Sequence, residues 1–175
     1  MLELIETFET NALEAAAEVR RIRATSTALR DEIEQTTKSA ASIVLGAGEF
    51  LPASLMEPLG DLPGVLAAPT DDQLSKAEVG ICGAFAGVAC SGSVCVAMGP
   101  RLVAMTSLLM PFHIVLLSAN RIVARPRDLF DPECFNGEGL RRNLVFITGP
   151  SATADMGPLV RGVHGPHRLR VLILE

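Results

Sequence analysis

The sequence has no tryptophan and no tyrosine, and aromatic residues make up only 4% of its 175 residues. Because aromatic rings are a main means of stacking on nucleic-acid bases, this composition offers few platforms for them. The net charge is −5 at pH 7, which argues against a general surface for nucleic acids or anionic membranes. We therefore expect an aliphatic core and no nucleic acid among the partners.

The sequence also lacks the marks of an exported protein. Its first residues are acidic and amphipathic, with no basic segment followed by an apolar one. The four cysteines show neither the dense spacing of a disulfide framework nor the spacing of a zinc site or a ferredoxin-type cluster. We expect a cytoplasmic protein with reduced thiols and no metal bound by Cys82, Cys90, Cys95 and Cys134.

One long stretch with little charge could be misread as a membrane span. Between Val79 and Ala119 the only charged residue is Arg101, and the stretch is long enough to cross a bilayer. Glycines and serines interrupt its first half, and Pro111 and His113 interrupt its second. Such punctuation is typical of successive buried pieces of a soluble sheet, so we expect no membrane insertion.

The spacing of apolar residues predicts alternating helices and short strands. This alternation predicts an α/β fold in three layers, with a largely parallel sheet flanked by helices. At 175 residues the chain suits a single domain, with an N-terminal helical part over 1–40. Helices are expected over 2–18, 25–39, from Pro52, over 70–77 and over 102–109, and strands over 19–22, 41–45, 64–67, 79–88, 93–97, 113–117 and 144–147.

Two familiar phosphate-binding motifs are incomplete or absent. Gly46 and Gly48 follow a predicted strand, but the third glycine of a dinucleotide fingerprint is missing. No glycine is followed by Lys and Ser or Thr at the spacing of a P-loop. A plain connection between a strand and a helix therefore remains the alternative at 46–48.

The stretch from Asn143 to Pro166 carries the strongest signal for a site. Its apolar run LVFI predicts a strand covered on both faces, and a turn with short polar side chains follows. These side chains could cap a helix whose free N–H groups and dipole attract anions. The alternative is a purely structural turn. The candidate ligand-binding residues here are Thr148, Gly149, Pro150, Ser151, Thr153 and Asp155.

A second candidate loop joins the two predicted strands 79–88 and 93–97. Glycine at such a junction allows a close approach of backbone or ligand. The neighbouring glycines of the first strand have an alternative role, which is to let a helix pack tightly. The candidate residues of this loop are Ser91, Gly92 and Ser93.

Three further residues are candidates for contact with a ligand. Arg101, if it points inward, needs an anionic partner, although it could equally mark a solvent-facing loop after Pro100. His113 begins a predicted strand, and His164 lies on a turn before the last one. For both histidines the alternative is a structural, hydrogen-bonded role. The residues alone identify no catalytic group.

Two ordered blocks of sequence resemble the lactate utilization protein C family, the LUD-domain proteins. One block is TGPSATAD followed by VRGVHGP and the closing strand LRVLILE. The other runs from Gly80 through the 91–94 segment to Arg101 and His113. Together they span roughly residues 75–175, and their agreement in order makes a chance match improbable.

The resemblance implies a fold similar to the ribose-phosphate isomerase and CoA-transferase group. It also implies a subunit of a system that oxidises L-lactate to pyruvate, acting mainly by binding iron-sulfur partner proteins. The clusters would lie on those partners, so no cofactor is expected on this chain. A small-anion site and a homo-oligomer are both compatible with this role. The alternative is a small stand-alone enzyme that holds a phosphate, nucleotide, folate or CoA-like ligand at the same loops.

Three positions depart from the family pattern. Cys90 stands where relatives usually have Glu, Ala152 where they commonly have a basic residue, and Gly157 where they have an acidic one. Losing charged side chains at two candidate loops would weaken a site for a charged substrate. The departures therefore predict a changed ligand or a mainly structural role for these loops.

Overall fold

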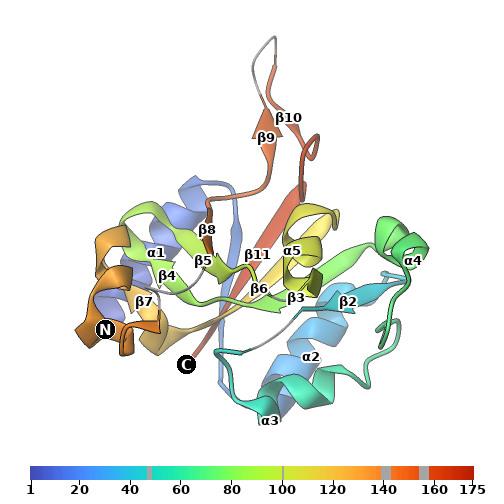
Figure 1. The fold of residues 1–175 in the computed structure, drawn as a ribbon, viewed down its shortest axis with the longest axis horizontal. Coiled ribbons are helices and arrows are strands. Elements are labelled where there is room, and N and C mark those ends of the chain that lie inside the picture. The colour runs from blue at the N-terminus through green and yellow to red at the C-terminus, as the bar shows by residue number, and fades with distance from the viewer. Residues whose placement is uncertain (47–48, 100, 139–142, 154–157) are drawn as a thin grey trace.

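The computed structural model describes residues 1–46, 49–99, 101–138, 143–153 and 158–175 (Figure 1). In these residues a five-stranded sheet forms the centre, with the order β1-β11-β6-β3-β2 and parallel pairing throughout. This arrangement confirms the predicted α/β class with a largely parallel sheet. The strands are β1 (Glu18–Ile22), β2 (Ile43–Leu45), β3 (Val79–Gly83), β6 (Phe112–Ser118) and β11 (Arg168–Leu174).

One face of the central sheet is covered by α2 (Ser26–Thr37) and α3 (Ala53–Met56) (Figure 1). The Thr25 side chain caps α2 by accepting a hydrogen bond from the Ala28 N–H at 3.3 Å. Apolar residues of α2 and α3 pack on alternate residues of β6 and β11 in one buried cluster. Members of this cluster include Leu29, Ile33, Leu55, Ile114, Leu116 and Leu172.

The opposite face is covered by α1 (Leu2–Glu14) and a second, smaller sheet, with α1 lying beside β4 and β5 in Figure 1. The second sheet has the order β7-β4-β5-β8. Phe8 and Ala12 of α1 are fully buried in a cluster with Val115 and Leu117 of β6. The strands of this sheet are β4 (Ala86–Val88), β5 (Ser93–Ala97), β7 (Ile122–Val123) and β8 (Leu144–Ile147).

Helix α5 (Arg101–Leu108) packs unusually close to β3. A Cβ atom built on Gly80 would lie 2.7 Å from Cβ of Thr106 and 2.8 Å from Cγ of Met110. Glycine at this position therefore allows the helix to approach the strand. The remaining elements are α4 (Asp71–Lys76), α6 (Pro132–Phe135), η1 (Glu57–Leu59), η2 (Ala89–Ser91), η3 (Ala119–Arg121), η4 (Pro126–Phe130), β9 (Ala152–Thr153) and β10 (Val160–Arg161).

The strand predicted over 79–88 is divided between the two sheets. The Ala84 N–H donates to Leu116 O of the central sheet at 2.8 Å, and the next N–H, of Phe85, donates to Cys95 O of the second sheet at 2.8 Å. The prediction of one strand was wrong because the apolar run continues unbroken through this change of sheet. The strand predicted over 64–67 is only an isolated bridge between Val65 and Ile43.

The strand predicted over 144–147 is confirmed as β8, but its predicted burial on both faces and the helix start expected after it were wrong. Strand β8 is at the edge of the second sheet, antiparallel to β5, and its Phe146 side chain is 41% exposed. After the turn, 152–153 form β9, which pairs with β10, so the described residues contain no helix start there. The β9–β10 hairpin projects from the body of the molecule (Figure 1). Its backbone pairing replaces the helix expected from the capping residues.

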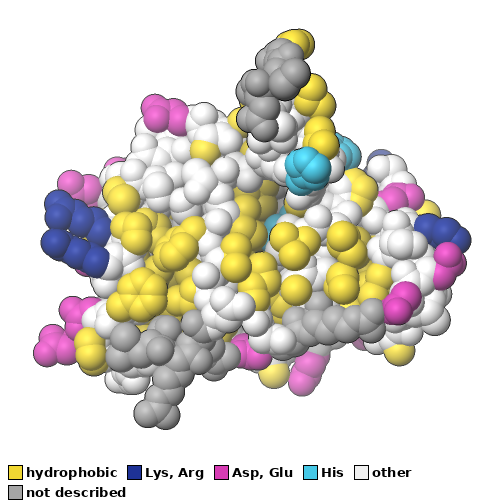
Figure 2. Space-filling model, turned by 45° about the horizontal axis from the view of Figure 1, so that its top comes forward, with side chains coloured by type: hydrophobic (Ala, Val, Ile, Leu, Met, Phe, Trp, Pro, Cys, Tyr) yellow, Lys and Arg dark blue, Asp and Glu magenta, His cyan; other side chains and the backbone are white. Residues whose placement is uncertain are grey.

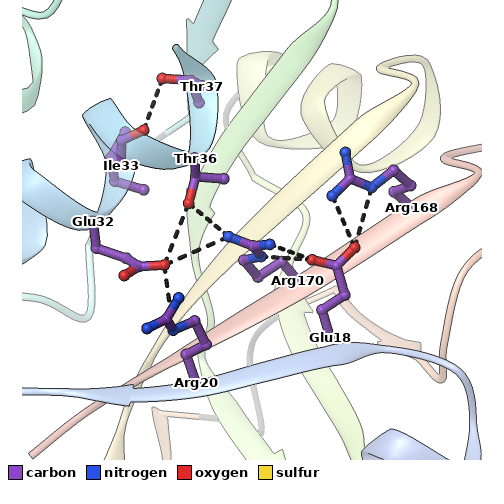
Figure 3. Close-up of polar contacts among 8 residues, drawn as sticks. All are labelled: Glu18, Arg20, Glu32, Ile33, Thr36, Thr37, Arg168 and Arg170. Atoms are coloured by element: carbon purple, nitrogen blue, oxygen red, sulfur yellow. Dashed lines mark hydrogen bonds and ion pairs between the residues drawn. The ribbon is translucent and has the colours of Figure 1, made fainter. Parts of the chain in front are cut away.

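A network of charged residues ties β1 and β11 to α2 (Figure 3). Glu18 of β1 accepts hydrogen bonds from Arg168 Nη2 at 2.9 Å and from Arg170 Nε at 2.7 Å. Arg170 Nη1 donates to Thr36 Oγ1 at 2.6 Å and lies 3.5 Å from the Glu32 carboxylate. Both carboxylates of this network, those of Glu18 and Glu32, have arginine partners. The network therefore leaves neither of these charges unpaired.

No helix in the described part of the chain has the length and apolar character needed to cross a membrane.

Candidate functional site

A pocket of about 440 Å³ lies at the amino end of the central sheet. His113 and Leu169, the second residues of β6 and β11, lie at its base, and β8 and the start of the hairpin form its walls. Figure 2 shows a hollow below the projecting hairpin, bordered by hydrophobic side chains and histidines. We call it the His113 pocket; it is lined by Ser107, Leu108, His113, Phe146, Ile147, Thr148, Gly149, Pro150, Ser151, Ala152, His164, Gly165, Pro166 and Leu169.

His113 is the most unusual polar residue of this pocket. Its side chain is fully buried, and Nε2 lies 3.2 Å from Sγ of Cys82 on the adjacent strand β3. Its other ring nitrogen, Nδ1, is buried without a hydrogen-bond partner among the described residues. Buried polar atoms nearly always have a partner, so an unpaired one beside a pocket points to an interaction with a ligand or water.

Burial keeps both groups of this pair uncharged near neutral pH. It lowers the pKa of His113 to about 4. It also raises the pKa of the Cys82 thiol to about 12, against the opposite effect of Thr106 and Ser107. The pair is therefore a neutral thiol beside a neutral imidazole, and the thiol is not in the nucleophilic thiolate form.

Among the residues that the structure describes, the lining of the His113 pocket includes no Lys, Arg, Asp or Glu. The helix end nearest to it is the C-terminal end of α5, where Ser107 and Leu108 lie. A helix C-terminus carries partial negative charge, which does not favour an anion. The pocket therefore offers neutral hydrogen-bonding groups and apolar walls instead of a fixed positive charge.

The two candidate loops meet through a chain of hydroxyl groups. Ser93 Oγ lies 2.7 Å from Thr148 Oγ1 and 2.7 Å from Ser91 Oγ. The antiparallel pairing of β5 with β8, which places Val94 opposite Ile147, brings the loops together. Thr148 lines the pocket, whereas Ser91 and Ser93 are not part of the lining. Ser93 contacts the pocket only through its hydrogen bond with Thr148.

Two glycines of these loops are required by packing against α1. Gly92 has φ +61°, and a Cβ there would lie 2.1 Å from N of Ala12. Gly149 has φ +69°, and a Cβ there would lie 2.0 Å from O of Ala15. Both positions combine a left-handed backbone with contact to backbone atoms, so only glycine fits. The conformation of both loops is thus set by α1.

The remaining candidates are divided by the fold. Pro150, Ser151 and His164 line the pocket, whereas Thr153 lies on β9 and is not part of the lining. Arg101 is the first residue of α5, about 10 Å along the helix from Leu108 at 1.5 Å per residue. Its side chain and all of Asp155 lie outside the described residues.

Sequence reasoning missed several residues of the pocket. Cys82 was expected only to be a reduced thiol without a metal, and Ser107 and Leu169 were not among the candidates. Cys82 and His113 are far apart in sequence and meet because β3 and β6 are adjacent, with Gly80 opposite His113. The only signal in the sequence for this contact was that both residues lie in segments predicted to be strands. In the described residues, no three His, Cys, Asp or Glu side chains converge to form a metal site.

The structure defines an α/β protein with a parallel central sheet and, at the amino end of that sheet, a pocket whose described lining residues are uncharged. Comparison with known families agrees with this class and makes it specific. The LUD domain matches residues 66–174, and the chain belongs to this family. The family resemblance inferred from the two sequence blocks is thereby confirmed.

Three relatives show how far the similarity extends. A protein of Neisseria meningitidis serogroup B is 30% identical over 55% of this chain and 42% of its own length. Lactate utilization protein C of Halalkalibacterium halodurans is 32% identical over 59% of this chain and 47% of its own length. The matches thus span less than half of these two relatives. Lactate utilization protein C of Deinococcus radiodurans is 28% identical over 98% of this chain and 80% of its own length.

A solved structure supports the fold. The crystal structure of a DUF162 family protein from Deinococcus radiodurans superposes with a TM-score of 0.72. The superposition covers 99% of this chain and 98% of that protein, at 24% sequence identity. This similarity establishes the arrangement of helices and strands along almost the whole chain.

Proposed function

We propose that this chain is a subunit of a lactate utilization system that supports the oxidation of L-lactate to pyruvate. The observation that carries the proposal is the alignment with a protein named lactate utilization protein C over 98% of this chain. The LUD domain match over residues 66–174 supports it. In this role the chain binds iron-sulfur partner proteins, which carry the electrons released from lactate, and holds a small anion itself.

Exposed apolar side chains around the His113 pocket support the binding of partners. Leu108 and Phe146, at the wall of the pocket, are 54% and 41% exposed. Three more apolar side chains on and next to the β9–β10 hairpin are each more than half exposed: Leu159, Val160 and Val163. Apolar surface of this kind is typical of sites that bind proteins or ligands.

The alternative function, a small stand-alone enzyme, is favoured by the pocket itself. A volume of about 440 Å³ is within the range of small-molecule sites, and the residue at its base is a histidine, the side chain that enzymes use most often as a general acid or base. The uncharged lining supports a phosphate, nucleotide or CoA ligand poorly, because these groups are usually held by Arg, Lys or a helix N-terminus.

The proposed function is tested in the organism that makes this protein. Removal of this chain should abolish growth on L-lactate and lactate-dependent dye reduction by cell extracts, and re-expression should restore both. Growth on glucose is the control. Undiminished lactate oxidation without the chain would contradict the proposal, and turnover of a substrate by the purified chain alone would favour the enzyme.

A further inference from the structure

We infer that the His113 pocket binds a small aliphatic monocarboxylate and that the Nδ1–H of His113 donates a hydrogen bond to an oxygen atom of this ligand. The inference rests on the small-ligand site of the proposed function and specifies its chemistry. It also assigns Cys82 as a positioning residue, which acts through His113 and does not touch the ligand.

The first argument concerns the position of the hydrogen on His113. Cys82 Sγ and His113 Nε2 are 3.2 Å apart and share one hydrogen bond. Sulfur is a weak acceptor and an imidazole nitrogen a strong one, so the favoured arrangement has the thiol donating to Nε2. The single hydrogen of the neutral ring is then on Nδ1. This nitrogen is buried without a partner in the described residues, and it needs an oxygen acceptor.

The second argument concerns the groups around His113. The hydroxyls of Thr106 and Ser107 both donate to Val103 O at 2.8 Å. Both hydroxyls also form hydrogen bonds with the Cys82 thiol, which oppose the rise of its pKa. Because sulfur can accept through its lone pairs, these contacts leave the hydrogen of the thiol available for His113 Nε2. The position of the ring hydrogen thus follows from contacts inside the protein, before any ligand is bound.

The third argument concerns the charge of the ligand. The described residues of the lining have hydrogen-bonding side chains, among them Thr148 and Ser151, and include no Lys or Arg. A phosphate group with about two negative charges would be stripped of water without a compensating cation. A carboxylate carries one charge, and neutral donors and remaining water can satisfy its oxygens. The lining therefore favours a monocarboxylate over a phosphorylated compound.

The fourth argument concerns size. The pocket volume of about 440 Å³ leaves room beyond a three-carbon acid. Leu108, Phe146 and Leu169 provide apolar wall on which an aliphatic chain can pack. We expect affinity to increase with the aliphatic length of the acid, because each buried methylene adds favourable transfer free energy.

The test measures binding to the purified full-length chain labelled with ¹⁵N-histidine. Pyruvate, L-lactate and 2-oxohexanoate are the probes, and inorganic phosphate and AMP are the comparison ligands. We expect the unliganded protein to show His113 protonated on Nδ1, and each acid to shift the Nδ1 signal, with 2-oxohexanoate binding tightest. A phosphate-induced shift of equal size, or no shift of His113 with any acid, would overturn the inference.

Variants of His113 distinguish the loss of its hydrogen bond to the ligand from a loss of the fold. His113→Leu should weaken binding about tenfold, the usual effect of losing one hydrogen bond to a charged group, whereas His113→Asn should retain part of the affinity because its amide can donate near the Nδ1 position. His167→Ala is the matched control, because this histidine is exposed and is not part of the lining. Equal affinity of His113→Leu and the unmodified chain would contradict the inference, provided that both unfold cooperatively.

Cys82 is tested by a readout that a merely structural residue would not change. Cys82→Ala should give a mixture of the two neutral tautomers of His113 and weaker binding, and Cys82→Ser should restore the Nδ1–H form. An unchanged tautomer in Cys82→Ala would contradict the positioning role.

The pH dependence distinguishes a neutral donor from an imidazolium. Among the described residues, the titratable groups at the pocket are His113 itself, Cys82 in contact with it and His164 on the turn before β11. In a His164→Ala background we expect affinity for pyruvate to stay flat from neutral pH to about pH 5.5, because the pKa of His113 is about 4. Affinity that rises as the pH falls through about 6.5 would contradict the neutral donor.

These outcomes are independent of the lactate growth test. Binding without a growth defect would contradict the lactate role and leave the pocket chemistry intact. A growth defect with no binding would contradict this inference alone.

Discussion

The two faces of the central sheet differ in how they pair their polar groups at the amino ends of the adjacent strands β1, β11 and β6. On the α2 face, Arg168 and Arg170 of β11 and Glu18 of β1 pair with one another and with α2 (Figure 3). On the other face, His113 of β6 points to an uncharged pocket and has one nitrogen without a partner in the described residues.

Strand alternation produces this difference. Successive side chains of a strand point to opposite faces. On β6, Phe112 therefore lies on the α2 face, where Cζ of Arg168 is 4.1 Å from the centre of the Phe112 ring. The next residue, His113, lines the pocket on the other face. On the α2 face, the charges of the network in Figure 3 are paired and serve the structure. The pocket face shows a polar group whose partner is not supplied by the described protein. Unpaired buried groups, more than clusters of charge, therefore mark the candidate binding surface.

The largest expected effect is the pH dependence that His113 imposes on stability. Its pKa is about 4 in the folded chain and about 6.5 when unfolded. The unfolded chain therefore binds more protons between these values, and the free energy of unfolding falls as the pH falls from about 6.5 to about 4. The loss amounts to about 3 kcal/mol. Urea unfolding across this range should show it, and His113→Leu should remove this part of the slope.

The α2 face responds to acid in a different window. Burial raises the pKa of Glu18, but hydrogen bonds from Arg170 and Arg168 outweigh it and leave the pKa below its ordinary value of 4.5. The stability that this group contributes is present above about pH 4.5 and is lost as the pH falls through the lowered pKa. Parallel pH profiles of the unmodified chain and His113→Leu above about pH 4.5 would contradict the assignment of the first window to the pocket face.

A smaller effect should follow from breaking the charged network. Arg170→Ala leaves Glu32 without one of its partners, and that carboxylate side chain is only 9% exposed. We expect a loss of about 2 kcal/mol, between the effects for exposed and buried pairs. The matched control is Arg168→Ala, whose side chain is 47% exposed and which should cost at most about 0.5 kcal/mol. Urea unfolding at neutral pH measures the free energy of unfolding of both variants. Equal losses in the two variants would contradict the expectation that the more buried ion pair contributes more.

The smallest effect is expected behind the pocket, in the hydroxyl chain. Ser93→Ala removes the side chain that links Ser91 to Thr148, and we expect a cost of about 1 kcal/mol. Binding of 2-oxohexanoate should weaken only slightly, because Ser93 is not part of the pocket lining. Loss of binding as large as that of His113→Leu would place the ligand at the serines and not at His113.

The residues alone were sufficient for much of the fold. The helices predicted over 25–39 and 70–77 are α2 and α4, with Thr25 and Thr70 as their N-terminal caps. The apolar run at 113–117 correctly predicted β6, and the family resemblance was confirmed by the LUD domain match. Local patterns carry this information because caps and hydrophobic periodicity depend on neighbouring residues.

The sequence by itself also identified several residues of the pocket walls, since Thr148, Ser151, His113 and His164 are candidates on the basis of residue type and position in the chain. Only the tertiary structure decided how they are used. The choice between a helix and the β9–β10 hairpin, and the meeting of Cys82 with His113, depend on strand pairing between distant segments. Local sequence does not specify such pairing, because the same apolar alternation fits several partners and registers. The burial that keeps His113 neutral, and thereby defines what the pocket can bind, exists only once those strands have paired.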